Sequence, residues 1–366
     1  MSIRLILFFL FLNASLFAQT DFSKIDKHAK DAPRSVAKSS KTLVDYLTKN
    51  ADTDLEKVRA IYIWMVDNIK YDFAGLEKRK SADQAWAEKQ SAPTVLKYKK
   101  GVCQGYANLF IELAEQAGLE AIFVTGNTKK QRGRIPRTGH AWNVVKIDEE
   151  WKIIDATWGA GAADSNSPNA TKNQEKFFLS DPSELILSHF PNDPVFQLSP
   201  NPVLFAEFEK DDEQLQAAWN KRQSEPAPTF TNFNESISIF SKISDPDERV
   251  CVSSERMLER DPTSEYGNYQ KGECLYKSAI KDYQSMNKEA IAASKKQSVS
   301  KDNLKNWSVE LERISKVSEE AKLYLAKVPA RSKFSANSRG MTRSLNKFDS
   351  NLKKQKTQYD TRLKGK

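Results

Sequence analysis

Apolar residues near the beginning of the chain recur every three or four positions. The residues in this series are Val58, Ile61, Tyr62, Met65 and Ile69. This spacing places them on one face of a helix. We therefore expect helix from about residue 31 to residue 71, ending in a polar turn at residues 70–72.

A second helical stripe begins at a cysteine. It consists of Cys103, Ala107, Phe110, Ala114 and Ala117. This pattern predicts a helix that opens at Cys103 and is buried along its body. Gly118 stands where a helix C-cap glycine belongs, and residues 121–125 then have the composition of a short strand.

The segment 140–155 alternates in a way that predicts a β-hairpin with a polar turn near residues 148–150. A loop of two residues, 148–149, would put His140 and Asp155 on the same face as diagonal neighbours, about 7–8 Å apart. A three-residue loop would put them on opposite faces unless a bulge restored the register. The hairpin therefore makes a register prediction that can be checked.

Beyond residue 200 the composition changes. Pro226 and Pro228 indicate a linker, and the sequence after it is helical in character. We expect a first domain at 31–205, a linker at 206–230 and a helical C-terminal region at 231–366. The basic tail from residue 353 onward is expected to fray.

The first residues resemble a signal peptide. Arg4 precedes an apolar run at residues 5–12 that is too short to span a bilayer, and Ala18 is a plausible cleavage point. We expect residues 1–18 to be removed and the protein to be exported, to the periplasm, the cell surface or the medium. The formal net charge of +9 favours acidic contact surfaces but does not choose among them.

The chain has three cysteines. Cys251 and Cys274 flank the turn at residues 261–264 at similar distances, so they would face each other in a helical hairpin. They could form a disulfide or pack as two free thiols. Cys103 is then the unpaired, reactive thiol.

Cys103, His140 and Asp155 have the chemistry of a nucleophile, a base and an orienting acid. A helix N-terminus and a nearby histidine both favour a thiolate. His140 could accept the proton and return it to a leaving amine, while Asp155 holds the imidazole. His189 is interpreted as structural.

Three motifs resemble the transglutaminase-like superfamily, in its cytokinesis-type and kyphoscoliosis-peptidase-like branch. They are KVRAIYIWMVDNIKYD, then APTVLKYKKGVCQGYANLFIELAEQAGLEAIFVTG, then GHAWNVVKIDEEWKIIDATWG. A fourth segment, FFLSDPSELILSHFPNDPVFQL, is similar to the segment after the aspartate in that branch. The resemblance implies a papain-like α+β fold, in which a cysteine-bearing helix packs on an antiparallel sheet. It also places the family's nucleophile, base and acid on Cys103, His140 and Asp155.

One position departs from the family pattern. The animal transglutaminases have tryptophan directly after the cysteine, whereas this chain has Gln104. Candidates for a side-chain oxyanion donor are Gln104, Trp86 and Tyr98. Trp142 and Trp158 flank the triad and either line an acyl groove or pack the hairpin. No calcium-site pattern is present, and we expect no metal and no cofactor.

These residues together imply acyl transfer through a thioester to a protein or peptide substrate, such as a cell-wall peptide. The outcome would be proteolysis, deamidation or crosslinking. The alternative is a catalytically silent scaffold or interaction protein. Under either hypothesis the basic C-terminal helices could contact an acidic surface, and no nucleic-acid motif is present.

Overall fold

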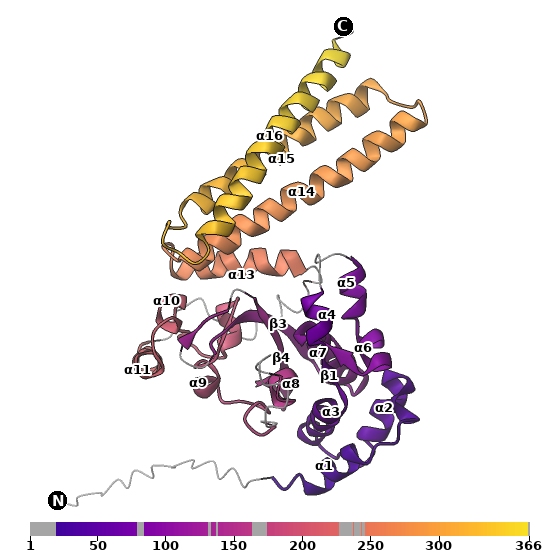
Figure 1. Cartoon of the computed structure of the whole chain (residues 1–366), viewed down its shortest axis with the longest axis vertical. Helices are drawn as coiled ribbons and strands as arrows, with labels where there is room; N and C mark the ends of the chain where they lie inside the picture. Colours follow the sequence, from indigo (N-terminus) through magenta and orange to yellow (C-terminus); the bar gives the residue numbers. More distant parts are fainter. Residues whose placement is uncertain are drawn as a thin grey trace, which may run out of the picture.

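The computed structural model describes residues 20–78, 84–130, 133–136, 138–162, 174–226, 237, 243 and 246–364. An α+β body contains the described residues up to 226, and long helices project from one side of it (Figure 1). The expected fold class, an antiparallel sheet with a cysteine-bearing helix and then a helical region, is therefore confirmed.

The main sheet has four antiparallel strands in the order β5-β4-β3-β6. They are β3 (Ala121–Thr128), β4 (His140–Ile147), β5 (Glu150–Ile154) and β6 (His189–Pro191). A separate parallel pair joins β1 (Lys70–Tyr71) to β2 (Lys100–Gly101). This pair holds the C-terminal end of the helix at Asp54–Asn68 beside the start of the helix at Cys103–Gln116.

The hairpin between β4 and β5 has the register that the even loop requires. Ile147 pairs with Glu150, and Asp148 and Glu149 both adopt positive φ, at 48° and 64°. Two central residues with positive φ form the tight turn that suits the twist of paired strands. Of the two loop lengths that the sequence left open, the structure has the two-residue loop, which puts His140 and Asp155 on the same face.

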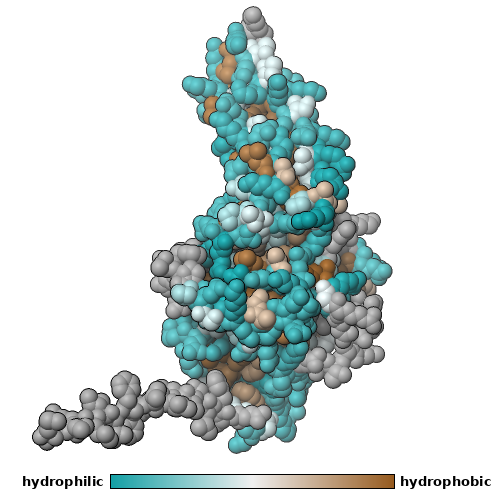
Figure 2. All heavy atoms as spheres, turned by 90° about the vertical axis from the view of Figure 1, so that its left-hand side faces the viewer, coloured by the Kyte–Doolittle hydropathy of each residue, from teal (hydrophilic) through white to brown (hydrophobic). Residues whose placement is uncertain are grey.

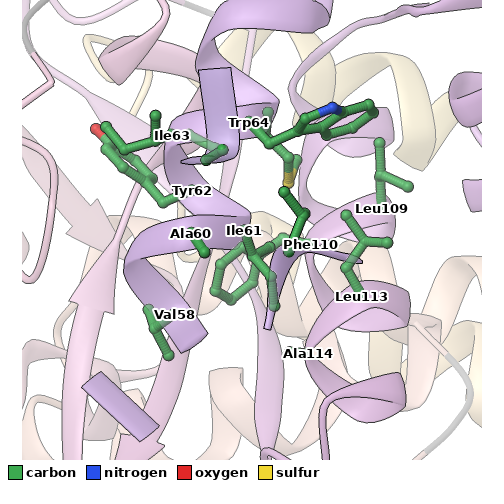
Figure 3. Close-up of a cluster of buried hydrophobic side chains, with 14 of the residues drawn as sticks. Val58, Ala60, Ile61, Tyr62, Ile63, Trp64, Leu109, Phe110, Leu113 and Ala114 are labelled. Carbon is green, nitrogen blue, oxygen red and sulfur yellow. The ribbon is translucent and has the colours of Figure 1, made fainter. Parts of the chain in front are cut away.

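The core lies between α3 (Asp54–Asn68), α7 (Cys103–Gln116) and the sheet (Figure 3). Nine consecutive residues of α3, from Val58 to Val66, are buried. A helix apolar on nearly all sides belongs in the middle of a domain. The buried Arg59 is compensated by Asp26 and Glu175 through four hydrogen bonds of 2.5–2.9 Å.

The predicted helix at 31–71 is wrong as one continuous element. The structure divides it into a short 3-10 helix η1 (Val36–Lys38), α2 (Ser40–Leu47) and α3. Thr53 begins α3 with a capping box, because its side chain accepts from the Glu56 backbone and Glu56 reaches back to it. An additional helix, α1 (Ser23–Lys30), packs on α3 although it precedes residue 31.

Shorter helices complete the body and lie around the core and the sheet (Figure 1). They are α4 (Phe73–Glu77), α5 (Gln84–Lys89), α6 (Ala92–Tyr98), α8 (Ala156–Gly159), α9 (Pro182–Leu185), η3 (Pro194–Gln197), α10 (Phe205–Phe208) and α11 (Asp212–Gln223). The last two fall in the predicted linker at 206–230, which is therefore wrong for residues 206–223. Phe208, Leu215 and Trp219 are buried in one cluster with Phe190 of β6, so this segment packs on the body.

Within residues 246–364, the C-terminal region has four long helices: α13 (Pro246–Arg260), α14 (Glu265–Lys295), α15 (Lys301–Ala326) and α16 (Ser335–Leu363). Cys251 of α13 and Cys274 of α14 form a disulfide, with Cα atoms 5.4 Å apart. The tail does not fray from residue 353, since α16 continues to Leu363 and Tyr359 is buried against Trp307.

The surface of the projecting helices is mostly hydrophilic, with scattered apolar side chains (Figure 2). Within the described ranges, no helix is long and apolar enough to cross a membrane. The predicted signal peptide at residues 1–18 lies outside the described residues.

Candidate active site

Cys103 is the first residue of α7, as its position after Gly101 predicted. The backbone N–H of Val102 donates to Gln90 Oε1 at 2.9 Å, which anchors the turn before the helix. At Gly105 an added Cβ would lie 2.7 Å from the same Gln90 oxygen, so only glycine fits there. Local packing thus fixes where the helix begins and where the thiol lies.

The imidazole of His140 connects the thiol to a buried carboxylate. His140 Nε2 lies 2.7 Å from Asp155 Oδ2, and both side chains are almost fully buried. The other ring nitrogen, Nδ1, remains for Cys103, whose thiol forms a hydrogen bond with the His140 side chain. The structure therefore brings together the three residues that the sequence proposed.

Asp155 also caps the next helix, α8. Its Oδ1 accepts from the backbone N–H groups of Thr157 at 2.8 Å and Trp158 at 3.1 Å. Burial opposes ionisation, but His140 outweighs it and holds the pKa of Asp155 well below its usual range. A buried carboxylate with this many donors is a fixed negative charge beneath the imidazole.

The charges around Cys103 favour a thiolate. Burial alone would raise the pKa of the thiol, but the hydrogen bond and charge of His140, with the Ala141 N–H, lower it. Burial also disfavours the imidazolium, yet Asp155 and Cys103 together raise the pKa of His140 to about 10. Both shifts act in the direction of a thiolate–imidazolium pair.

Tyr71 of β1 contacts both the thiol and the start of α7. Burial raises the pKa of Tyr71 most, and the negative charge of Cys103 raises it further. The Tyr71 hydroxyl accepts from the Cys103 backbone N–H and forms a hydrogen bond with the Cys103 side chain. The sequence interpretation did not single out Tyr71, although it lies in the first quoted motif.

The three candidate oxyanion donors do not all lie at the cleft. Gln104 and Trp86 line the same cleft as Cys103, whereas Tyr98 does not and is 65% exposed. Tyr71 joins Gln104 and Trp86 as a polar group beside the thiol.

The two flanking tryptophans pack against histidine rings and do not line the cleft. Trp142 is 2% exposed and stacks near His140, with ring centroids 5.9 Å apart. Trp158 lies 5.6 Å from His140 and 4.4 Å from His189. Their position supports the packing interpretation and not the groove interpretation.

His189 is a further member of the cluster that sequence reasoning had interpreted only as structural. Its Nε2 lies 3.2 Å from Asp155 Oδ2, and its Nδ1 lies 2.8 Å from Ser188 Oγ. Burial outweighs the attraction of Asp155 and lowers the pKa of His189 to about 4, so the ring is neutral. A neutral His189 can accept from Ser188 and donate to Asp155, which makes it a second donor to the carboxylate.

Among the described residues, His140, Asp155 and His189 form a group whose ligand atoms lie within 4.8 Å of one another. Two imidazoles and a carboxylate could hold a transition metal. Such an ion would compete with the hydrogen bond between His140 and Asp155. The expectation of no metal and no cofactor stays a prediction.

A cleft of about 840 Å³ opens at Cys103 and His140. Residues of β3, including Phe123 and Thr125, line one part of it, and residues of α13 and α14 line another. The cleft is large enough for several residues of a peptide. The Cys103 thiol, the His140 imidazole and a cleft with room for several peptide residues therefore lie together.

Comparison with known proteins shows that Cys103, His140 and Asp155 lie within one segment that matches a protein family. Residues 41–156 match the model of the transglutaminase-like superfamily. The chain is 35% identical to the kyphoscoliosis peptidase of Homo sapiens over 211 residues, which is 55% of this chain and 30% of that protein. It is 26% identical to cytokinesis protein 3 of Schizosaccharomyces pombe over 182 residues, 48% of this chain and 19% of that protein.

The chain thus spans less than a third of the length of these relatives. A crystal structure of a TGase aligns with 44% of this chain and 39% of its own, at 20% identity and a TM-score of 0.28. The matched segment contains Cys103, His140 and Asp155, while His189 and the C-terminal helices lie beyond it.

Proposed function

Residues 41–156 form a domain of the transglutaminase-like superfamily, and from this premise we propose that the protein is a cysteine acyl-transfer enzyme acting on amide bonds. The observation that carries the proposal is the series of contacts from Cys103 through His140 to Asp155, at the edge of a large cleft. Burial, charge and hydrogen bonding all act on the same three side chains.

In the proposed reaction the Cys103 thiolate attacks the carbonyl carbon of an amide. The proton from the thiol, held on His140 Nδ1, passes to the leaving nitrogen, which departs as an amine or ammonia. Polar groups that line the cleft at the thiol, among them Gln104, Trp86 and Tyr71, stabilise the developing oxyanion. Asp155 keeps the imidazolium oriented throughout.

The thioester is then resolved by water or by an amine. With water, His140 accepts a proton, a carboxylic acid is released and the thiol is restored. With an amine, a new amide forms. We favour hydrolysis of a protein or peptide, such as a cell-wall peptide, and the name of the human relative as a peptidase supports this choice.

The first test is modification of Cys103 by iodoacetamide across pH. His140→Ala removes the hydrogen bond and charge that lower the thiol pKa, so that burial remains. We expect modification at pH 6 to slow at least roughly tenfold, since one pKa unit changes the thiolate fraction about tenfold. His28→Ala, whose Nε2 contacts the Tyr46 carbonyl at 2.8 Å outside the cleft, is the matched control. If the rate of Cys103 modification is the same in His140→Ala as in the native chain, the alternative of a catalytically silent scaffold is favoured.

A peptide library containing glutamine and free amines separates the possible outcomes by mass spectrometry. Cleavage, deamidation and crosslinking each give a different mass change. We expect cleavage products with the native chain and none with Cys103→Ala. Amine-linked products without cleavage would replace the hydrolase proposal by a transferase.

We also propose that the protein is exported, on the strength of the apolar run at residues 5–12 and the small residues after it. N-terminal sequencing of the mature protein is expected to begin at Gln19. The basic C-terminal helices would then face acidic groups at the cell surface. Their binding to anionic polymer should weaken as salt rises, and salt-independent binding would argue against it.

A further inference from the structure

The cleft at Cys103 is not built by the superfamily domain alone. Part of its lining comes from the C-terminal helical region, including Arg249 of α13 and Tyr269, Gln270, Glu273 and Lys277 of α14. These residues lie more than 90 positions after the end of the family match at residue 156. Side chains of the helical region can therefore contact a substrate that is bound in the cleft.

The helices are fixed against the body by specific contacts. The Tyr266 hydroxyl donates to Asn192 Oδ1, and Arg256 lies 3.6 Å from the Asp193 carboxylate. Asn192 and Asp193 directly follow β6, the strand that carries His189. Arg260 also donates to the Pro202 carbonyl at 3.0 Å. These bonds hold α13 and α14 in place beside the cleft.

A hydrophobic cluster shared by the helices and the body also fixes α13 and α14 in place. Met257 and Tyr266 are buried in one cluster with Phe190, Phe205 and Phe208 of the body. The Phe205 and Tyr266 rings stack with centroids 4.6 Å apart. Helices α13 and α14 thus form a fixed wall of the cleft. Their side chains reach the cleft without a prior conformational change.

The wall residues of α14 share one face because of their spacing. Tyr266, Tyr269, Gln270, Glu273 and Lys277 follow one another at intervals of three, one, three and four residues. Such intervals line one side of a helix. This face offers hydroxyl, amide and charged groups, which suits a polar chain such as a peptide more than an apolar ligand.

Among the described residues that line the cleft, one cation has no acidic partner. Glu273 lies 3.5 Å from Lys277, and Lys333 lies 3.3 Å from Glu209. Arg249 donates from Nε to the Ile243 carbonyl at 2.5 Å and has no carboxylate partner among the residues that the structure describes. Its guanidinium group is planar and has donors in the arrangement that matches a carboxylate.

We propose that α13 and α14 form the outer wall of the substrate site, and that Arg249 binds a carboxylate of an acidic peptide whose amide lies at Cys103. The proposal rests on the proposed acyl-transfer function and adds the substrate class. The helical region is then a specificity element of the site.

The test compares peptide chloromethyl ketones that differ only in a flanking Glu, Gln or Lys. Each alkylates Cys103, so the rate reports binding in the cleft without a known substrate. We expect the wild-type protein to react at least roughly tenfold faster with the Glu peptide than with the Gln peptide, because a charge-assisted bidentate bond is strong. The Lys peptide should be slowest.

Arg249→Gln should remove the preference for the Glu peptide, and Arg249→Lys should retain part of it. Arg343→Gln on α16 makes the same charge change at a position that does not line the cleft, and should leave the preference unchanged. Equal wild-type rates with Glu and Gln peptides, or a preference that survives in Arg249→Gln, would overturn the proposal.

Iodoacetamide distinguishes this outcome from failure of the proposed function. It is small and uncharged, so its rate reports the reactivity of the thiol and not peptide binding, and each peptide rate is divided by the iodoacetamide rate of the same variant. An iodoacetamide rate of the same order as that of the wild type also shows that a variant is folded around Cys103. If instead iodoacetamide reactivity does not depend on His140, the acyl-transfer proposal fails whatever the peptide preference.

Discussion

At the scale of single residues, Asp155 is the centre of the site. It accepts hydrogen bonds from two imidazoles and two backbone N–H groups, and it is 1% exposed. A buried carboxylate is stable only when such donors replace water. In the proposed reaction His189 would act through Asp155, as a positioning residue.

His189 makes the stability of the protein dependent on pH. Its pKa is about 4 in the fold, below the value of about 6.5 for an unperturbed histidine. The unfolded chain therefore binds more protons between these values, and stability is lost as pH falls from 6.5 toward 4. His189→Gln keeps an N–H donor but does not titrate.

We expect His189→Gln to lose less stability than the wild type over this pH range, by up to a few kcal/mol as an order of magnitude. Urea unfolding at pH 7, 6, 5 and 4 measures the difference. Parallel pH profiles for the two proteins would show that His189 does not carry this dependence.

Tyr71 also contacts the thiol. Tyr71→Phe removes the hydroxyl that contacts the Cys103 side chain and N–H while it keeps the aromatic ring. We expect the thiol pKa to rise, because the thiolate loses a donor. The pH profile of iodoacetamide modification should move to higher pH, and an unchanged profile would exclude a role for Tyr71 in activating the thiol.

At the scale of elements, the disulfide joins the two helices that form the wall of the cleft. Cys251 and Cys274 are separated by 23 positions, and the turn between α13 and α14 lies inside the loop they close. A cross-link of this length limits the unfolded chain more than the folded one. It stabilises a helix pair whose faces are largely polar.

Replacing both cysteines by serine should lower the free energy of unfolding by about 3 kcal/mol, the value for a loop of this order. Urea unfolding with and without reductant measures the effect. Cys103→Ser is the control, since it leaves the disulfide intact and should respond to reductant as the wild type does. A double variant as stable as the wild type would mean that the bond adds nothing to stability.

At the scale of the whole molecule, the body and the base of the helical region share a core. Phe205 is 6% exposed and contacts Phe190 of β6, Tyr266 of α14 and Phe334 before α16, with ring centroids 4.6–6.1 Å apart. Side chains from both regions thus exclude water from the same cluster. We expect the two regions to unfold together.

Phe205→Ala should cost about 3–5 kcal/mol, because it deletes a buried ring that the surroundings cannot replace. Hydrogen exchange should show faster exchange in β6 and at the start of α14 together. Val309→Ala, at a position that is 62% exposed on α15, is the control and should have little effect. Loss of protection in only one region would mean that the shared core does not couple them.

The amino-acid sequence by itself determined the local parts of the site. The stripe that begins at Cys103 places the thiol at a helix start, and the alternation over residues 140–155 predicts the hairpin that carries His140 and Asp155, although its loop length stayed open until the structure gave the register. Both depend on periodicity and turn chemistry over a few residues, where the backbone leaves few alternatives. The single-helix and linker predictions failed where capping at Thr53 and burial of Trp219 competed with composition.

The tertiary structure alone decided which distant groups join this cluster. His189 meets Asp155 because β6 pairs with β3, and Tyr71 meets Cys103 because β1 pairs with β2. The wall from α13 and α14 reaches the cleft through a core assembled from both regions. Such contacts depend on strand order and on packing between segments far apart in the chain, and neither has a period that can be read from one sequence.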